Sequence, residues 1–177
     1  MPGQDAISDF RTLVTSAHST SATSHYRSKT IAAWLALLLG SLGVHRMYMY
    51  GLRDVRAWLH PLPTAIGLLG VERMQTLGQD DHLAWMLIPV LGLMLSLAML
   101  QAIIWALTPD EVWQQRYNPG RAAQATGWGP VLAAGLALLV GGTVLMGTIA
   151  FGGQKFFEWQ LQPDAAEPVQ NSTRLKP

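Results

Sequence analysis

Apolar positions are gathered into four blocks along the chain, at residues 31–50, 55–71, 83–107 and 131–151, with polar stretches between them. The block at 83–107 contains no charged residue. As a helix it would be about 37 Å long, more than the roughly 30 Å of a bilayer's hydrocarbon core. The pattern therefore predicts a membrane-spanning helix here.

The last apolar block predicts a second spanning helix over residues 128–153. Trp128, Gly129 and Pro130 introduce it, and proline is well placed in the first turn of a helix. The polar stretches before and after it are expected to be a loop at 109–127 and a tail at 154–177.

The first block, 31–50, is expected to form another span. It begins with fourteen uncharged residues, followed by His45 and Arg46. Fourteen residues cover only about 21 Å as a helix. The span would thus need the residues after Val44, with Arg46 extending toward the headgroups.

The block at 55–71 is ambiguous because it holds Arg56, His60, Pro61 and Pro63. Prolines spaced two apart break a regular helix, so the segment either crosses the membrane or turns back. Counting Lys and Arg on each side favours a cytoplasmic N-terminus if it crosses, and an external one if it does not. The number of spans and the orientation stay open.

These patterns predict an all-α membrane protein, a small bundle of three to four transmembrane helices with a proline-broken middle segment. A helix-pair region at 30–108 would hold the spans 31–50 and 83–107 and the broken segment 55–71. Residues 1–29 and 154–177 are expected to be flexible polar tails.

Composition supports this assignment and excludes several kinds of chemistry. Half of the residues are hydrophobic and 13% are charged, against about 25% charged in soluble domains. The chain has no cysteine, which excludes disulfides and thiolate sites. Its net charge of +1 gives no reason to expect nucleic acid as a partner.

Small and aromatic residues suggest how the helices pack and where they end. Small residues at four-residue spacing let membrane helices approach closely, as internal packing or as a dimer surface, and here they are Ala32, Ala36, Gly40, Gly43, Ala133, Ala137 and Gly141. Tryptophans favour the membrane interface, which predicts an interfacial belt of Trp85, Trp105, Trp128 and Trp159.

The end of the first block resembles the TM-two (NINE) domain family of small, mostly bacterial membrane proteins. The matching residues follow Arg27-Ser28-Lys29 and an apolar run, and read Gly40-Ser41-Leu42-Gly43-Val44-His45-Arg46-Met47-Tyr48-Met49-Tyr50-Gly51. Met47 stands in place of the usual Phe, and 83–107 lacks the acid that commonly follows a Trp in the family's second helix. The resemblance implies a divergent, extended member in a bacterial inner membrane, and no activity.

His45, Arg46 and Tyr48 are the leading candidates for chemistry. At a span end they would serve as an anchor, or would contact a lipid phosphate or a partner's carboxylate. His60 could join His45 in holding a haem or a metal, but few carboxylates lie nearby to orient them. We therefore expect no cofactor and no metal.

The two clear spans offer little for catalysis, since their polar side chains are only Ser96, Gln101, Thr143 and Thr148. None has an ionisable neighbour in its own helix, as an activated nucleophile would need. We expect a non-enzymatic accessory or scaffold protein that packs against membrane lipids, other membrane proteins or itself. The alternative is a small transporter or a lipid- or cofactor-binding subunit that uses the break at 55–71.

Overall fold

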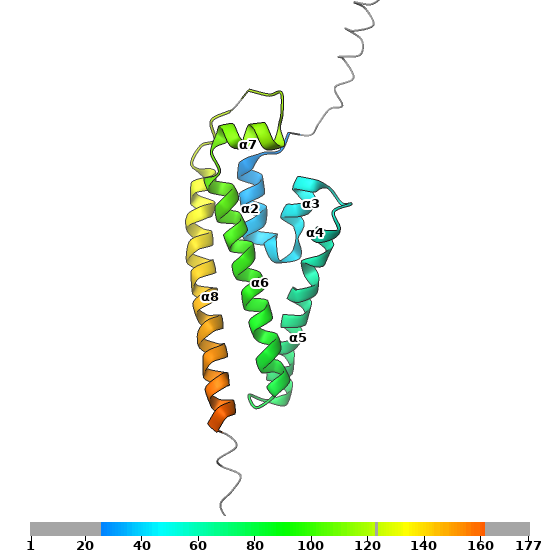
Figure 1. Ribbon diagram of the computed structural model, residues 1–177, viewed down its shortest axis with the longest axis vertical. Helices are drawn as coiled ribbons and strands as arrows, with labels where there is room; N and C mark the ends of the chain where they lie inside the picture. Colours follow the sequence, from blue (N-terminus) through cyan, green and yellow to red (C-terminus); the bar gives the residue numbers. More distant parts are fainter. Residues whose placement is uncertain (1–25, 123, 162–177) are drawn as a thin grey trace, which may run out of the picture.

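The computed structural model describes residues 26–122 and 124–161, and this part of the chain is entirely helical. Figure 1 shows long helices packed side by side, with a short helix across one end. In chain order the elements are α2 (Lys29–Leu39), the 3-10 turn η1 (Gly40–Leu42), α3 (Val44–Tyr50), α4 (Val55–Leu59), α5 (Pro61–Leu77), α6 (His82–Leu107), α7 (Asp110–Tyr117) and α8 (Gly129–Leu161).

Two of these helices, α6 and α8, are long and apolar enough to cross a membrane. They contain 26 and 33 residues, which corresponds to about 39 and 50 Å. The sequence prediction of an all-helical fold with apolar spans at 83–107 and 128–153 is confirmed to this extent. The predicted tails lie mostly outside the described residues, although α8 continues eight residues into the second one.

The prediction of one spanning helix over 31–50 is wrong. Figure 1 shows α2 running from the α7 end of the bundle to its middle, and α3 returning toward the same end. The reversal occurs at Gly43, whose φ of 77° is left-handed. Such a conformation suits glycine because it has no Cβ. This apolar block thus forms a helical hairpin and not one membrane-spanning helix.

The middle block is less broken than its prolines suggest. Asp54 caps α4 by accepting a hydrogen bond from the Arg56 backbone N–H at 3.1 Å. The chain bends at His60, and Pro61 and Pro63 occupy the first turn of α5, where a backbone N–H has no helical partner to lose. From there α5 continues without interruption to Leu77.

Helix α5 packs closely along α6 through glycines. A Cβ added at Gly67 would lie 2.3 Å from the Cβ of Leu91, and one at Gly70 would lie 2.6 Å from that of Leu87. These contacts leave no room for a side chain. Helix α5 therefore runs beside the part of α6 that lies away from α7, whereas α4 lies beside α3 (Figure 1).

The core among α2, α6 and α8 is built from small residues, which allow the helices to approach closely. A Cβ at Gly40 would lie 2.7 Å from that of Ala98, and one at Gly141 would lie 2.6 Å from that of Met99. All seven small residues predicted to mediate packing are buried inside the chain: Ala32, Ala36, Gly40, Gly43, Ala133, Ala137 and Gly141.

The region predicted as a polar loop at 109–127 contains helix α7, which lies across the end of the bundle (Figure 1). Asp110 and Glu111 occupy its first turn and Arg116 its last turn, a distribution that suits the helix dipole. One indole from this helix, that of Trp113, is buried against the core.

Candidate functional site

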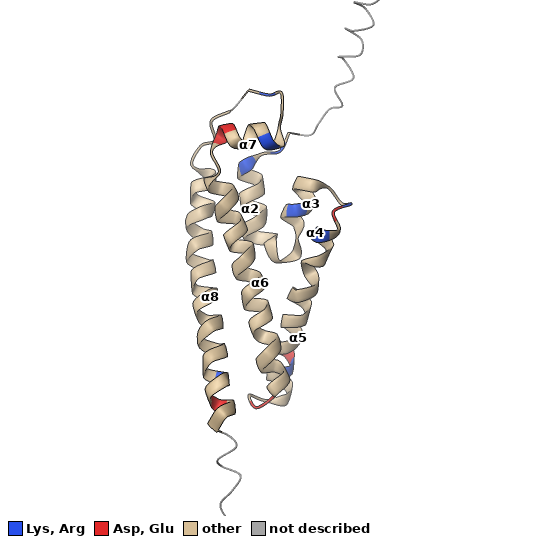
Figure 2. Cartoon of the chain, viewed as in Figure 1, with Lys and Arg blue, Asp and Glu red and all other residues tan. Residues whose placement is uncertain are grey.

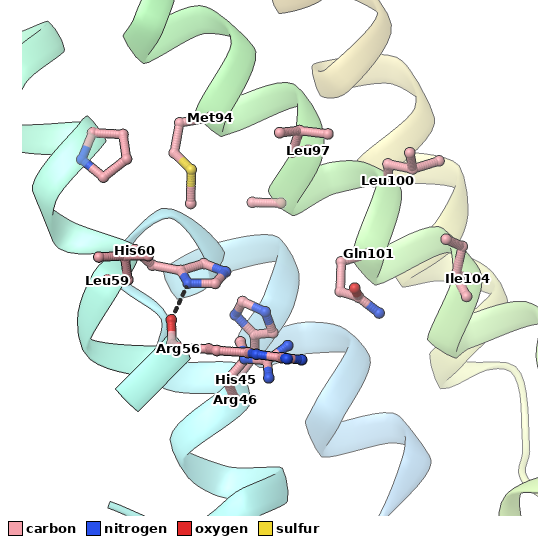
Figure 3. Close-up of a pocket in the computed structure, with 12 residues that line it drawn as sticks. His45, Arg46, Arg56, Leu59, His60, Met94, Leu97, Leu100, Gln101 and Ile104 are labelled. Carbon is pink, nitrogen blue, oxygen red and sulfur yellow. Dashed lines mark hydrogen bonds between the residues drawn. The ribbon is translucent and has the colours of Figure 1, made fainter. Parts of the chain in front are cut away.

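A pocket of about 400 Å³ opens between α3, α4, α5 and α6. Figure 3 shows its two sides. His45, Arg46, Arg56 and His60 gather on the side of α3 and α4, whereas α6 contributes apolar side chains and one amide: Met94, Leu97, Ala98, Leu100, Gln101 and Ile104. The pocket is thus cationic on one side and apolar on the other.

Asp54 pairs with one arginine of the pocket and caps the helix that carries the other. Its Oδ2 accepts hydrogen bonds from Arg46 Nε at 3.0 Å and pairs with a terminal guanidinium nitrogen at 2.9 Å. Its Oδ1 accepts the Arg56 backbone N–H. Desolvation raises the pKa of Asp54, but the bonds from Arg46 and Arg56 outweigh it and the net pKa is lowered. The carboxylate therefore stays charged and holds the α3–α4 turn together.

Arg56 differs from Arg46 because its guanidinium has no ion-pair partner within the described residues. The residue is exposed, and its backbone carbonyl oxygen is hydrogen-bonded to His60 Nδ1 at 2.7 Å. Arg46 and Arg56 carry two positive charges and Asp54 one negative charge, so the group has a net positive charge. This arrangement favours binding of an anion and opposes binding of a cation.

His45 is the most buried polar side chain of the pocket, at 1% exposure. Its Nδ1 has no hydrogen-bond partner in the described part of the chain. The ring packs edge-on against His60 at 5.4 Å and Trp105 at 5.3 Å between centroids. A buried polar atom without a partner is costly, and the described part of the chain leaves this nitrogen unsatisfied.

The sequence prediction brought together His45, Arg46 and Tyr48, and the structure separates the third from the first two. The Tyr48 hydroxyl accepts the Ser28 backbone N–H at 2.9 Å and does not line the pocket. Arg56 takes its place. Asp54 in front of an apolar segment is a capping signal that would have predicted the start of the helix that carries Arg56.

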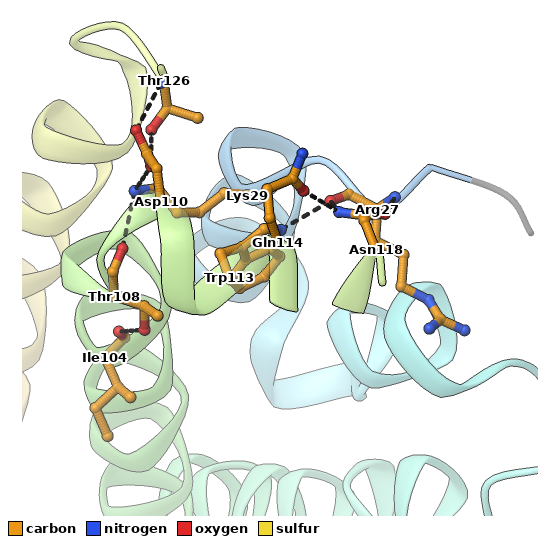
Figure 4. A network of polar contacts seen from close by, with 9 residues as sticks. All are labelled: Arg27, Lys29, Ile104, Thr108, Asp110, Trp113, Gln114, Asn118 and Thr126. Carbon is orange, nitrogen blue, oxygen red and sulfur yellow. Dashed lines mark hydrogen bonds and ion pairs between the residues drawn. The ribbon is translucent and has the colours of Figure 1, made fainter. Parts of the chain in front are cut away.

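A second polar cluster fixes α7 over the start of α2 (Figure 4). Lys29, 6% exposed, donates to Asp110 at 2.5 Å and to the Thr108 carbonyl at 2.9 Å. Thr126 donates to Asp110 through its backbone N–H and its hydroxyl. Burial raises the pKa of Asp110, but the hydrogen bonds from Lys29 and Thr126 and the charge of Lys29 lower it to about 2.

The same cluster continues on the other side of α7. Asn118 accepts the Arg27 backbone N–H at 2.8 Å and donates to the Arg27 carbonyl at 3.1 Å. Trp113 donates its indole N–H to that carbonyl at 2.8 Å, and Gln114 accepts from Asn118 at 2.7 Å. Each of these buried polar groups has its partner inside the cluster, so we assign it a structural role.

The predicted tryptophan belt needs correction. Trp85 and Trp105 are 7% and 5% exposed, so both rings contact protein and present almost no surface to the surroundings. The Trp85 indole donates to the Gln79 carbonyl at 2.6 Å, and the Lys155 ammonium lies 4.7 Å from its ring centre. Trp128 and Trp159 are largely exposed, and their place at the interface stays a prediction.

No protein-family model, curated protein or solved structure matches this chain. The part of the chain that the structure describes also contains no group of three or more His, Cys, Asp or Glu side chains placed to hold a metal ion. The pocket geometry is therefore the main guide to function.

Proposed function

We propose that this chain is a non-enzymatic integral membrane protein that binds the acidic headgroup of a membrane lipid. The observation that carries the proposal is the pocket between α3, α4–α5 and α6, with His45, Arg46 and Arg56 on one side and apolar side chains on the other. An acidic phospholipid is complementary to both sides, because it joins an anionic phosphate to hydrocarbon.

Exposed apolar side chains support the membrane location. Soluble monomers rarely expose contiguous apolar patches beyond a few hundred Å². Large apolar side chains are more than half exposed along α5, α6 and α8: Leu62, Leu68, Leu69, Leu77, Met86, Leu97, Ile104, Leu107, Leu132, Leu138, Leu139, Met146 and Ile149. Hydrocarbon would cover them without cost.

In the arrangement we propose, three segments cross the bilayer: α4–α5, α6 and α8. Together α4 and α5 cover residues 55–77, about 34 Å of helix. The pair α2–α3 enters from one side and returns to it, which is tolerated where protein covers the irregular backbone. Gly43 meets this condition, since a Cβ there would lie 2.3 Å from the Ala57 carbonyl oxygen.

The pocket lies near the α7 end of the bundle, where the arginines of the α3–α4 turn can meet headgroup phosphates. Charge-assisted hydrogen bonds from arginine to phosphate are stronger than neutral ones. The side chains that line the pocket, all from the described residues, include no hydroxyl, thiol or carboxylate. A binding role thus has support that a hydrolytic role lacks.

A scaffold role, in which the small residues at four-residue spacing contact a partner, has less support. The small residues that a partner would have to contact are already packed inside the chain, as Gly40 against Ala98 and Gly141 against Met99 illustrate. The resemblance at residues 40–51 supports two further proposals, membership of the TM-two family and a place in a bacterial inner membrane.

The test is lipid binding by the purified full-length chain in detergent, measured by native mass spectrometry with phosphatidic acid and phosphatidylcholine. We expect preference for phosphatidic acid, and about a tenfold loss of that binding in Arg56→Gln, since a charged hydrogen bond contributes roughly 1.5–3 kcal/mol. Arg53→Gln is the matched control: it is exposed in the same turn but does not line the pocket. Equal losses in both variants, or no preference for the acidic lipid, would refute the proposal.

A further inference from the structure

We infer that the site takes a two-chain acidic phospholipid whose acyl chains lie on either side of α6. This inference rests on the proposed function, because it extends the headgroup pocket to the hydrocarbon part of the same ligand. It comes from a second groove, which the headgroup alone does not use.

The second groove has a volume of about 270 Å³ and lies between α6 and α8. It is lined almost entirely by hydrocarbon, including Leu93, Met99, Leu138 and Leu145. Its one hydroxyl, that of Ser96, already donates to the Gly92 carbonyl at 2.8 Å. An apolar ligand segment therefore suits this groove, and a polar one would find no partner in it.

The two hollows are neighbours. Leu97 and Leu100 of α6 line both of them, so these side chains form a ridge with one hollow on each side. Both are half-exposed or more, at 59% and 50%. A ligand with a single chain would fill one hollow and leave the other to bulk lipid. A ligand with two chains can pass one chain along each side of the ridge.

The charge of the site lies on only one of these hollows. Arg46 and Arg56 line the pocket beside α3, whereas the α6–α8 groove has no charged side chain in its lining. The headgroup is thus fixed on the α3 side, and the second chain reaches the α6–α8 groove by crossing the Leu97–Leu100 ridge. The arrangement selects for an acidic headgroup and a branched, two-chain tail together.

Gly142 allows a selective test because it lines the second groove and a Cβ there meets nothing within 4 Å. Gly142→Leu should therefore fill the groove without disturbing the helix packing. Gly147→Leu is the matched control, since Gly147 is equally open on the same helix and lies outside the groove lining.

The experiment compares dioleoyl phosphatidic acid with its single-chain lyso form by native mass spectrometry of the full-length chain. We expect the wild type to bind the two-chain lipid about tenfold more tightly. Gly142→Leu should remove most of that advantage and leave lyso binding unchanged, while Gly147→Leu should behave as the wild type.

The outcomes separate this inference from the proposed function. If both lipids bind equally to the wild type, or if Gly142→Leu keeps the full two-chain advantage, the inference is overturned, and the headgroup site stands as long as Arg56→Gln weakens both lipids. If neither lipid binds, or if Arg56→Gln weakens neither, the headgroup site itself is refuted, and the inference with it.

Discussion

At the scale of single residues, the site depends on two residues that do not themselves bind a ligand. Asp54 draws Arg46 toward α4 and caps the helix that presents Arg56. Gly43 allows α3 to fold back so closely that an added Cβ would lie 2.3 Å from the Ala57 carbonyl oxygen. The cationic side of the pocket is a product of this tight turn.

Gly43→Ala tests the turn directly. The substitution forces alanine into a left-handed conformation, at a cost of about 1–2 kcal/mol, and adds a clash that should cost about 1–3 kcal/mol more. Gly120→Ala is the control, because Gly120 also has a positive φ, 82°, but its Cβ would meet open space. Denaturant unfolding of the purified full-length chain in detergent should show the larger loss for Gly43→Ala; equal losses would mean that the close approach to Ala57 is absent.

The ion pair between Lys29 and Asp110 predicts a pH dependence. The pKa of Asp110 is lowered to about 2, so its stabilising effect is complete above its ordinary pKa near 4 and is lost as the pH falls toward 2. Asp110→Asn should therefore lower the free energy of unfolding by about 1–2 kcal/mol at pH 7, allowing for the partial exposure of the carboxylate.

Thermal unfolding at a series of pH values checks this prediction. The difference between wild type and Asp110→Asn should shrink below pH 4 and disappear near pH 2. Glu111→Gln, at the exposed neighbouring position, should have a much smaller effect, because Glu111 forms no ion pair within the described residues. A difference at pH 2 as large as that at pH 7 would show that Asp110 acts through shape rather than through its charge.

At the scale of helices, the sequence predicted some elements well because their signals are local. Uncharged runs identified α6 and α8, whose length and apolarity need no knowledge of the rest of the chain. The prolines at 61 and 63 were interpreted as a break, yet both lie in the first turn of α5, where proline is tolerated. Helix α7 was missed because only its Trp113 and Gln114 are buried.

The hairpin α2–α3 could not be predicted from hydropathy, because an apolar run does not reveal that the chain reverses within it. The glycines at 40 and 43 were noted as packing residues, but the left-handed φ of Gly43 was not predicted. As a consequence, His45 and Arg46 were found as candidates, whereas their approach to Arg56 and His60 was not. That approach requires the reversal, which brings α3 against α4.

The contact between α5 and α6 leads to a prediction for Gly67. Its Cβ would lie 2.3 Å from that of Leu91, so Gly67→Leu should push the helices apart and lower the midpoint temperature of unfolding by several degrees, as a loss of about 1–3 kcal/mol does. Gly135→Leu on α8 places its side chain in open space and should leave the midpoint temperature unchanged. If both variants unfold like the wild type, α5 does not pack on α6 as described.

At the scale of the whole molecule, the charges are distributed unequally between the two ends (Figure 2). Among the described residues, the positive side chains at the α7 end are Arg27, Lys29, Arg46, Arg53, Arg56, Arg116 and Arg121. The other end of the bundle has only Arg73 and Lys155. Short segments rich in Lys and Arg remain in the cytoplasm. For the three-span arrangement proposed above, this rule predicts that the pocket faces the cytoplasm.

That arrangement is tested most directly by single-cysteine labelling, which the cysteine-free chain makes clean. Arg53→Cys, Gln79→Cys and Gln115→Cys place exposed thiols in the α3–α4 turn, the α5–α6 turn and α7. With a membrane-impermeant maleimide, Gln79→Cys should react in intact cells, and Arg53→Cys and Gln115→Cys only after the cells are opened. If Arg53→Cys reacts together with Gln79→Cys and apart from Gln115→Cys, residues 31–50 cross the membrane once, and the hairpin that builds the pocket does not exist.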